Sequence, residues 1–330
     1  KDKRRVRLEA LLENDQIRDQ VVDLLSERQE ILETNQLQAY SPYDYQRGFH
    51  AAKDEQGGLA RQRMLMAGNK TGKTYCGAME LAYHLTGLYP DWWEGVKYTK
   101  PVKAWAAGNT SNNTRDIVQY ELLGEPGDPE QFGKGTIPKH LIISTERQPG
   151  IPNAVSQVVV KHISGKNSKL QLKSYEQGKM AWMGTAVHCC WLDEEPPQDI
   201  YSQALRATLK TGGLVYMTFT PESGLTDVCS QFMNNIKPGQ ALYRATWDDA
   251  PHLSKDIREE ILAALPPHER EMRSKGIPVL GSGLVFPIPE DQISVPPFQI
   301  PQHWARLAGI DFGYDHPTAV TWLAHDRDND

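Results

Sequence analysis

The sequence predicts an α/β fold in which a mostly parallel sheet carries helices on both faces. Short apolar runs that read as strands alternate with stretches of helical periodicity, and this alternation is typical of a parallel sheet with crossover helices. The predicted strands are 64–67, 102–107, 155–163, 186–192, 214–218 and 241–245, and helical patterns follow the first two at 74–85 and 112–123. With 39% hydrophobic and 24% charged residues, the composition is that of a globular protein.

Length and charge narrow the class of protein further. A chain of 330 residues is long enough for about two domains. The net charge of -6 argues against a wholly basic nucleic-acid binder, but it leaves room for local basic patches. No apolar run approaches the roughly 20 residues that span a bilayer, so no membrane partner is predicted. The N-terminus is basic and lacks an apolar signal core, so secretion is not indicated.

The four cysteines predict buried, reduced thiols in a cytoplasm. They are Cys76, Cys189, Cys190 and Cys229, and the adjacent pair lies inside an apolar run. This spacing suits neither a zinc site nor a disulfide framework.

Apolar periodicity and the positions of Gly and Pro residues predict the segments that lie outside the sheet. Residues 1–38 repeat apolar side chains at three- and four-residue steps, which predicts an amphipathic helix, or a pair of helices, packing on the body. Ser41-Pro42 ends it, Gly57-Gly58 marks a loop, and the Gly- and Pro-rich stretch 124–152 predicts a long surface excursion. Residues 254–275 predict helices between an N-cap at Ser254 and a stop at Gly276. A linker is expected at 281–302, then two strands of a new unit at 304–310 and 318–323.

The strongest motif is a phosphate-binding loop between the first strand and its helix. The residues are Ala67, Gly68, Asn69, Lys70, Thr71, Gly72, Lys73 and Thr74, which match G-x-x-x-x-G-K-[ST] except that Ala67 replaces the first Gly. In such a loop the backbone N–H groups wrap a phosphate at the helix N-terminus. Lys73 is predicted to reach the β/γ-phosphates, and the Thr74 hydroxyl to ligate Mg²⁺.

A second motif predicts the carboxylates of a nucleotide-hydrolysing site. The apolar run 187–192 leads directly into Asp193, Glu194 and Glu195. Asp193 would hold Mg²⁺, directly or through water, and Glu194 would activate the attacking water. We prefer Glu194 over Glu195 for this role by position. The acid pair favours a hydrolase over a nucleotide kinase, and Asp311-Phe312-Gly313 lacks the His-Arg-Asp loop of a protein kinase.

With these motifs in place, the chain resembles the large subunit of bacteriophage terminases, the DNA-packaging motors of tailed phages, and particularly the headful-packaging type of Salmonella podoviruses. The likeness runs from about Ser41 to the end of the chain. It is carried by Met66–Asn69, Gly72-Lys73, Glu80–Gly87, Trp191–Pro197, Thr218–Pro221, Gly276–Pro278 and Asp311–Gly313 with His316-Pro317.

The resemblance implies roles for residues outside the two motifs. Gln46 would read the adenine edge, and Tyr43 or Tyr45 would stack on the base; the plainer interpretation is a Pro-initiated helix start. Thr218 and Thr220 would form the coupling motif that senses the γ-phosphate, although threonine is common in any strand. The segment from Asp248 to Leu253 and the helices after it would form a lid that moves with nucleotide state.

One departure concerns the arginine finger, since many terminases carry an Arg inside this loop where the chain has Asn69 beside Lys70. The transition-state charge would then be met by Lys70 or by an Arg of a neighbouring subunit, with Arg115 and Arg206 as candidates. Each of these is as readily a surface or structural arginine.

The C-terminal strands resemble the start of a two-metal RNase H-like nuclease domain. Asp311 matches its first metal-binding carboxylate, and a divalent metal would bind there only in the complete nuclease. Because one carboxylate cannot hold two metals, no competent nuclease is expected in this chain, which reads as a fragment.

The expected protein is therefore an ATP-hydrolysing, Mg²⁺-dependent motor that translocates double-stranded DNA into a procapsid. Expected partners are the portal protein, the small terminase subunit and copies of the chain itself in a ring, expected to be a pentamer. It would act in the host cytoplasm, docked transiently on the procapsid and absent from the mature virion. The alternatives are a DExx-type helicase and a non-enzymatic scaffold with a degenerate loop. Intact Lys73, Thr74, Asp193 and Glu194 disfavour the scaffold.

The expected organisation has five parts. These are an N-terminal helical segment (1–38), a P-loop ATPase core of the ASCE/RecA-like class (39–225), a lid (226–280), a linker (281–302) and the beginning of the nuclease domain (303–330). A basic cluster of Lys161, His162, Lys166 and Lys169 could track DNA phosphates, or form a solvated hairpin.

Overall fold

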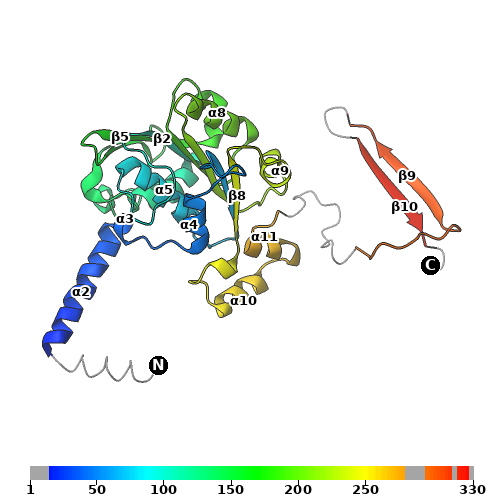
Figure 1. Ribbon diagram of the computed structural model, residues 1–330, viewed down its shortest axis with the longest axis horizontal. Coiled ribbons are helices and arrows are strands. Elements are labelled where there is room, and N and C mark those ends of the chain that lie inside the picture. Colours follow the sequence, from blue (N-terminus) through cyan, green and yellow to red (C-terminus); the bar gives the residue numbers. More distant parts are fainter. Residues whose placement is uncertain (1–14, 279–293, 314–317, 327–330) are drawn as a thin grey trace. The chain divides into compact units, whose positions relative to one another are not determined.

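The computed structural model describes residues 15–278, 294–313 and 318–326 (Figure 1). The chain divides into a large unit, residues 1–285, and a small one, residues 286–330. Each is described by itself.

The large unit is built on one eight-stranded sheet with the order β3-β4-β5-β2-β6-β7-β1-β8. Strands β2, β5, β6, β7, β1 and β8 run parallel, whereas β3 and β4 are antiparallel additions next to β5. The strands are β1 (Gln62–Ala67), β2 (Lys103–Gly108), β3 (Ile142–Arg147), β4 (Val155–Lys161), β5 (Asn167–Ser174), β6 (Cys189–Asp193), β7 (Leu214–Phe219) and β8 (Gln240–Ala245). The predicted mostly parallel α/β sheet is confirmed.

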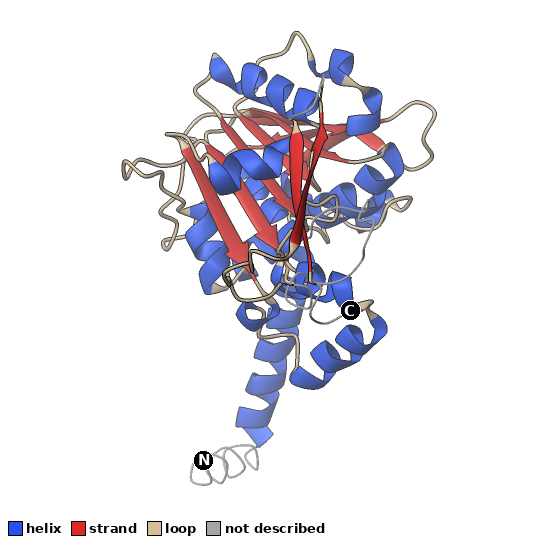
Figure 2. Cartoon of the chain, turned by 90° about the vertical axis from the view of Figure 1, so that its right-hand side faces the viewer, coloured by secondary structure: helices blue, strands red, loops and turns tan. Residues whose placement is uncertain are grey.

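Helices lie on both faces of this sheet (Figure 2). The described helices of the large unit are α2 (Asp15–Thr34), α3 (Gln36–Ala39), α4 (Asp44–His50), α5 (Lys73–Thr86), α6 (Ser111–Asn113), α7 (Tyr120–Leu123), α8 (Gln198–Leu209), α9 (Asp227–Asn234), α10 (Lys255–Ala264) and α11 (Arg270–Lys275). A π-helical stretch, Thr114–Gln119, joins α6 to α7 within the predicted helix 112–123. Ser254 caps α10, and Gly276 ends α11 in the left-handed conformation, as predicted.

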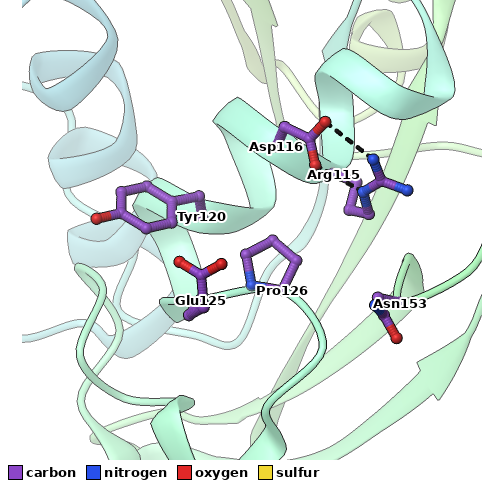
Figure 3. Close-up of a pocket in the computed structure, with 6 residues that line it drawn as sticks. All are labelled: Arg115, Asp116, Tyr120, Glu125, Pro126 and Asn153. Atoms are coloured by element: carbon purple, nitrogen blue, oxygen red, sulfur yellow. Dashed lines mark hydrogen bonds and ion pairs between the residues drawn. The ribbon is translucent and has the colours of Figure 1, made fainter.

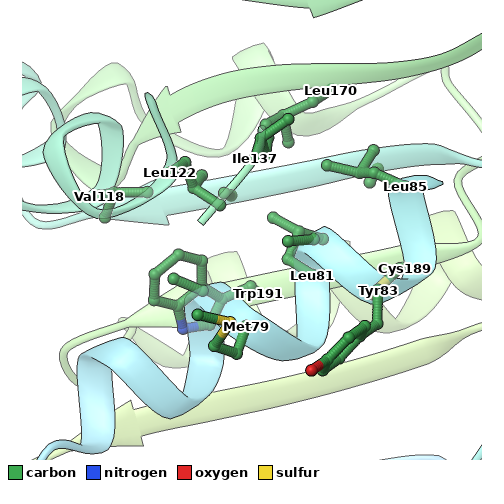
Figure 4. Packing of buried hydrophobic residues seen from close by; sticks show 14 of the residues in the cluster. Met79, Leu81, Tyr83, Leu85, Val118, Leu122, Ile137, Leu170, Cys189 and Trp191 are labelled. Carbon is green, nitrogen blue, oxygen red and sulfur yellow. The ribbon is translucent and has the colours of Figure 1, made fainter. Parts of the chain in front are cut away.

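Two apolar clusters, one on each sheet face, fix the position of the loops at the strand ends. Helix α5 packs on one face, where Leu81, Leu85, Leu170 and Trp191 are buried together (Figure 4). The other face packs α8 and α9 against β6 and β7. Burying apolar surface on both faces explains why β1, β6 and β7 are continuous apolar runs rather than alternating ones. All four cysteines are free and buried, as predicted.

The structure corrects the stretch 124–152, which is not simply a surface excursion. It contains the edge strand β3, and Phe132, Thr136 and Ile137 are buried. The prediction also missed β5, whose only apolar residues are Leu170 and Leu172. The apolar signal of both strands is weak, because β3 is an edge strand with nearly all its residues exposed and β5 buries only its alternate residues fully.

Two further expectations need adjusting. In helix α2, Val22, Leu24 and Leu25 are all more than half exposed, so this part of the helix does not pack on the body as expected. The lid boundary at 226 also moves, because β8 pairs with β1 and α9 packs on the core, so the part outside the sheet begins at Thr246. The segment 1–14 and most of the expected linker lie outside the described residues.

The small unit is an antiparallel pair, β9 (Ala305–Asp311) and β10 (Ala319–His325), which confirms the two predicted strands. Every residue of both strands is exposed. Over the described residues, no helix is long and apolar enough to cross a membrane.

Candidate active site

The predicted phosphate-binding loop connects the carboxyl end of β1 to the first turn of α5. Gly72 has φ 95° and Lys70 has φ 59°, so the chain turns twice through the left-handed region. Glycine adopts this region freely, but for Lys70 it costs about 1 kcal/mol, which the surrounding contacts must offset. The hydroxyl of Thr71 donates to the carbonyl of Gly68 at 2.9 Å and closes the loop on itself.

Four consecutive carbonyl groups of this loop accept a hydrogen bond from a side chain. Trp247 Nε1 donates to the oxygen of Asn69 at 2.8 Å, and His252 Nε2 lies 2.9 Å from that of Lys70. Tyr45 Oη donates to Thr71 at 2.7 Å, and Gln46 Nε2 donates to Gly72 at 3.1 Å. The donors come from α4 on one side and from the segment after β8 on the other. Together they hold the carbonyl groups of residues 69–72.

The backbone N–H groups of residues 70–74 have no acceptor among the described residues. Buried or half-buried N–H groups without partners are rare in folded proteins. A run of them at the start of a 14-residue helix is an anion-binding site, because the N–H dipoles and the helix N-terminus both favour negative charge. The loop therefore has the electrostatics of a phosphate cradle.

Lys73, Thr74 and Asp193 meet at this cradle. Asp193 ends β6, is 2% exposed, and accepts a hydrogen bond from the Thr218 hydroxyl at 2.7 Å. Burial raises the pKa of Asp193 to about 6, although the Thr218 hydroxyl, the Lys73 ammonium and the Thr74 hydroxyl each act to lower it. A hydroxyl and a carboxylate side by side, beside a phosphate cradle, are the oxygen ligands that Mg²⁺ prefers, so the donor set fits that ion.

Glu194 is held at the edge of the same site in a strained backbone conformation, with φ 63°. Its N–H donates to the carbonyl of Thr218 at 3.0 Å. Burial first, and the neighbouring Asp193 charge second, raise the pKa of Glu194 to about 7, against the lowering effect of Lys73. A carboxyl group with a pKa near neutrality is suited to accept a proton from water. Glu195 instead bonds to the Thr226 hydroxyl.

A buried chain of hydrogen bonds runs from β6 to β7 and back to the acid. Trp191 Nε1 donates to Thr218 Oγ1 at 2.8 Å, and the Thr218 hydroxyl donates to Asp193 Oδ1 at 2.7 Å. Two residues later, just after the end of β7, the Thr220 hydroxyl donates to the carbonyl of Ala67 at 2.8 Å. The two predicted coupling threonines thus contact the acid strand and the start of the phosphate loop.

The chain after β8, most of which the sequence predicted to be a lid, packs directly on the loop through contacts that the sequence did not predict. The N–H of Asn69 donates to the carbonyl of Arg273 at 2.7 Å. A Cβ atom on Gly68 would lie 2.5 Å from the Ser274 carbonyl oxygen, and one on Gly276 would lie 2.7 Å from the Ala67 backbone. Arg273 pairs with Glu222 and Glu269 and acts to lower the pKa of Glu194. No sequence signal predicts that Trp247, His252 or Arg273 contacts the loop, because only the fold brings them there.

The residues of the expected adenine motif contact the protein. Gln46 is buried; its Oε1 accepts from the N–H of Tyr43 at 2.9 Å while its Nε2 bonds the loop. It therefore caps α4 and ties that helix to the phosphate loop, with one amide N–H left over. Tyr43 stacks on His252 with ring centroids 5.7 Å apart, and its hydroxyl lies 2.8 Å from His252 Nδ1.

The two arginine-finger candidates are not among the described contacts of the loop. Arg115 is paired with Asp116 and donates to the Pro152 carbonyl at 3.1 Å. It lines a shallow pocket of about 500 Å³ with Tyr120, Glu125, Pro126 and Asn153 (Figure 3). Arg206 is exposed on α8. Asp311 is exposed on β9, and the described residues contain no cluster of three or more metal-binding side chains.

Together, the sheet order, the loop between β1 and α5, and the acids at the end of β6 define a P-loop α/β protein. Similarity to known proteins identifies the family to which the chain belongs. The family described as "Terminase large subunit, T4likevirus-type, N-terminal" matches residues 64–293. A terminase large subunit of Salmonella phage P22 is 37% identical over 342 residues, covering 98% of this chain and 68% of that protein. The large terminase ATPase domain of Thermus phage P74-26 has the same fold, with TM-score 0.51 and 17% identity over 74% of this chain and 96% of that domain.

The chain belongs to the family of phage terminase large subunits and is a subunit of a DNA-packaging motor. These matches favour the packaging motor over the helicase alternative.

Proposed function

We propose that this chain binds and hydrolyses ATP at the loop between β1 and α5, and that this hydrolysis drives double-stranded DNA into a procapsid. The observation that carries the proposal is the row of free N–H groups at residues 70–74, whose neighbouring carbonyl groups are held by side chains. A large terminase from a thermophilic bacteriophage, with TM-score 0.50 to this chain, has been solved in complex with ADP. That neighbour supports a nucleotide as the ligand.

Each residue at the loop has a separate role in ATP hydrolysis. The N–H groups of residues 70–74 bind phosphate oxygens, and the Lys73 ammonium neutralises the charge between the β- and γ-phosphates. Thr74 and Asp193 would hold Mg²⁺, which when bound neutralises developing charge on the phosphates. Glu194 orients the attacking water and accepts its proton, for which it must be ionised. Thr218 keeps Asp193 in place, since its hydroxyl donates to the carboxylate.

The remaining charge on the transferring phosphate is assigned to Lys70 or to an arginine of a neighbouring subunit. The side chain of Lys70 is exposed, and its left-handed backbone places it at the turn of the loop. Arg115 and Arg206 remain the candidates for the arginine supplied in trans. Thr218 and Thr220 would report the γ-phosphate to β7, and Gln46 with Tyr43 or Tyr45 would hold the adenine.

The wider assembly is also proposed. It comprises a ring of copies, taken as a pentamer, docked on the portal protein in the host cytoplasm, together with the small terminase subunit. The lid, the linker and the start of a nuclease domain at Asp311 keep the boundaries given above, apart from the lid start at Thr246.

Replacing one carboxylate tests this function. We expect Glu194→Gln to lower the rate of DNA-stimulated ATP hydrolysis by at least about 100-fold, because the water loses its base. Nucleotide affinity, measured with a fluorescent ATP analogue, should change by less than about threefold. The matched control is Glu195→Gln, which alters the neighbouring acid and should keep most of the activity. Equal hydrolysis by wild type and Glu194→Gln would remove Glu194 from this role, and separation of a short duplex into strands would favour a helicase.

A further inference from the structure

On the sheet face opposite α5, the residues at one end of β2 and β5 and along β4 are exposed or half-buried, whereas further along β2 Trp105 and Ala107 are buried with Trp182. Along β5 the residues Ser168, Leu170, Leu172 and Ser174 are buried, whereas the alternate residues Asn167, Lys169, Gln171 and Lys173 lie on the opposite face. Alternate residues of a strand point to opposite faces, so this second face is a continuous surface across neighbouring strands. Four lysines stand on it: Lys103 on β2, Lys161 on β4, and Lys169 and Lys173 on β5. We call them the lysine face.

The register of the strands brings these lysines together. Lys103 is the direct partner of Lys169 on the neighbouring parallel strand. On the other side of β5, Lys169 pairs with Val159 and Asn167 pairs with Lys161, so Lys161 is diagonal to Lys169 on the same face. Adjacent strands are about 4.8 Å apart, so three ammonium groups extend from one small area. Lys103, Lys161 and Lys169 are all exposed.

No carboxylate of the described chain pairs with these three lysines. The only acid on strands β2–β5 is Glu146, at the edge, and it accepts from the Gln157 amide at 2.6 Å. Like charges directly opposed in a sheet are destabilising, so the stability of the sheet does not explain this arrangement.

Protection of a sheet edge does not explain the arrangement. Lysines that prevent edge-to-edge pairing belong on edge strands, but β3 is the edge here and the lysines lie on inner strands. Lys173 differs from the other three, since its ammonium donates to the Ala181 carbonyl at 2.8 Å and lies 4.9 Å from the Trp105 ring centre. Burial lowers the pKa of Lys173. The part of the lysine face that is free to bind a ligand is therefore the exposed trio Lys103, Lys161 and Lys169.

We propose that Lys103, Lys161 and Lys169 bind the phosphate backbone of duplex DNA during packaging; this assignment rests on the proposed function. Exposed ammonium groups without hydrogen-bond acceptors around them bind phosphates as point charges and read no sequence. That is what a motor moving along any sequence needs. The structure also revises the basic cluster predicted from sequence: His162 is buried with its ring on Ser164 and the Tyr98 carbonyl, and Lys166 lies at the hairpin turn.

The test is the salt dependence of DNA binding by the whole 330-residue chain. The variant is Lys103→Gln with Lys169→Gln, and the probe is a fluorescent 30-base-pair duplex titrated at several salt concentrations between about 50 and 200 mM. Each phosphate contact contributes about 0.9 to the slope of log affinity against log salt, so we expect the slope to fall by about 2. Affinity at the lowest salt should fall at least about tenfold, equally for two unrelated sequences.

Three controls accompany the variant. The charge-preserving pair Lys103→Arg with Lys169→Arg should bind like the wild type. Lys210→Gln, an exposed lysine after α8, should leave the slope unchanged. Because a like-charge pair is removed, the double Gln variant should unfold at the same temperature as the wild type or higher, which separates lost binding from lost folding.

The outcomes distinguish this proposal from the proposed function. ATP hydrolysis without DNA should be the same in all variants, and only its stimulation by DNA should fall in the double Gln variant. An unchanged slope in that variant overturns the lysine face as a DNA site, even if the wild type is an active ATPase. Loss of binding to an acidic polypeptide such as polyglutamate, with DNA binding retained, overturns it in favour of a protein partner. A wild type that hydrolyses no ATP contradicts the proposed function, while the binding slopes still decide the lysine face.

Discussion

Two adjacent carboxyl groups, Asp193 and Glu194, are buried beside one lysine. Taking carboxylates out of water disfavours their charged form, and the single ammonium of Lys73 does not fully compensate for two of them. The pKa of Asp193 is therefore raised to about 6 and that of Glu194 to about 7. Without a bound cation the site holds protons that the unfolded chain would release.

This predicts how stability depends on pH in the absence of metal. Because the folded-state pKa of Asp193 lies above its unfolded value, the folded chain binds more protons between about pH 4 and pH 6. The free energy of unfolding therefore falls as pH rises through this window. We expect Asp193→Asn to remove this loss and to stabilise the metal-free protein at pH 8 by on the order of 2 kcal/mol, with little effect at pH 4. Urea unfolding at both pH values measures it; equal effects at both would contradict the assignment.

Substitution of Thr218 is expected to affect both the stability of the protein and its binding of nucleotide. Its hydroxyl receives the Trp191 N–H and donates to Asp193, so Thr218→Val leaves a buried donor and a buried carboxylate unsatisfied. We expect a loss of about 2–3 kcal/mol in unfolding free energy and weaker Mg²⁺-dependent nucleotide binding. Thr218→Ser keeps the hydroxyl and should recover most of both. Recovery of neither property by Ser would show that the methyl group, not the hydroxyl, matters.

At the scale of elements, the contact between α11 and the phosphate loop depends on glycine. Gly276 has φ 64°, and an added Cβ would lie 2.7 Å from the Ala67 backbone; Gly212 has the same φ with nothing within 4 Å. We expect Gly212→Ala to cost about 1 kcal/mol of stability for the left-handed backbone alone. Gly276→Ala should cost more and should also weaken nucleotide binding, because α11 is pushed off the loop. Thermal unfolding and ATP-analogue binding would detect the difference; matching costs would place α11 away from the loop.

A buried ionic cluster joins the elements on the opposite side of this loop. Glu80 of α5 bonds to Arg63 of β1, to His50 of α4 and to His84, and all four are almost fully buried. Burial alone would raise the pKa of Glu80, but the Arg63 charge and the histidine hydrogen bonds outweigh it and hold the pKa well below its usual range. Burial lowers the pKa of both histidines, so they stay neutral. The cluster ties α4, and with it Gln46, to the helix that begins at the phosphate site.

At the scale of the whole molecule, the two units differ in how much of their apolar surface they bury. The β9–β10 pair exposes Leu307, Trp322 and Leu323, and an isolated two-stranded hairpin is marginally stable in water. We expect backbone amides of residues 305–311 and 319–325 to exchange with deuterium within seconds to minutes. Amides of β1, β6 and β7 should stay protected for far longer. Protection of the hairpin equal to that of β1 would show that it has a partner surface.

The motifs for hydrolysis could be predicted from sequence because their chemistry is local. Lys73, Thr74, Asp193 and Glu194 follow apolar strands directly, and the carboxyl ends of parallel strands must meet at one edge of the sheet. The strands β3 and β5 were missed because β3 is an exposed edge strand and β5 buries only its alternate residues fully. The lid start was misplaced because β8, which follows α9 in the chain, returns to pair with β1.

By itself, the sequence determined the α/β class, the phosphate loop and the two acids, since each depends on neighbours within a few residues. Only the tertiary structure decided what holds the loop: Tyr45 and Gln46 from α4, and Trp247, His252 and Arg273 from the chain after β8. It also decided that Lys103 stands beside Lys169, 66 positions away. Such contacts join residues far apart in the chain, and they exist only when strand order and register bring those residues to the same place.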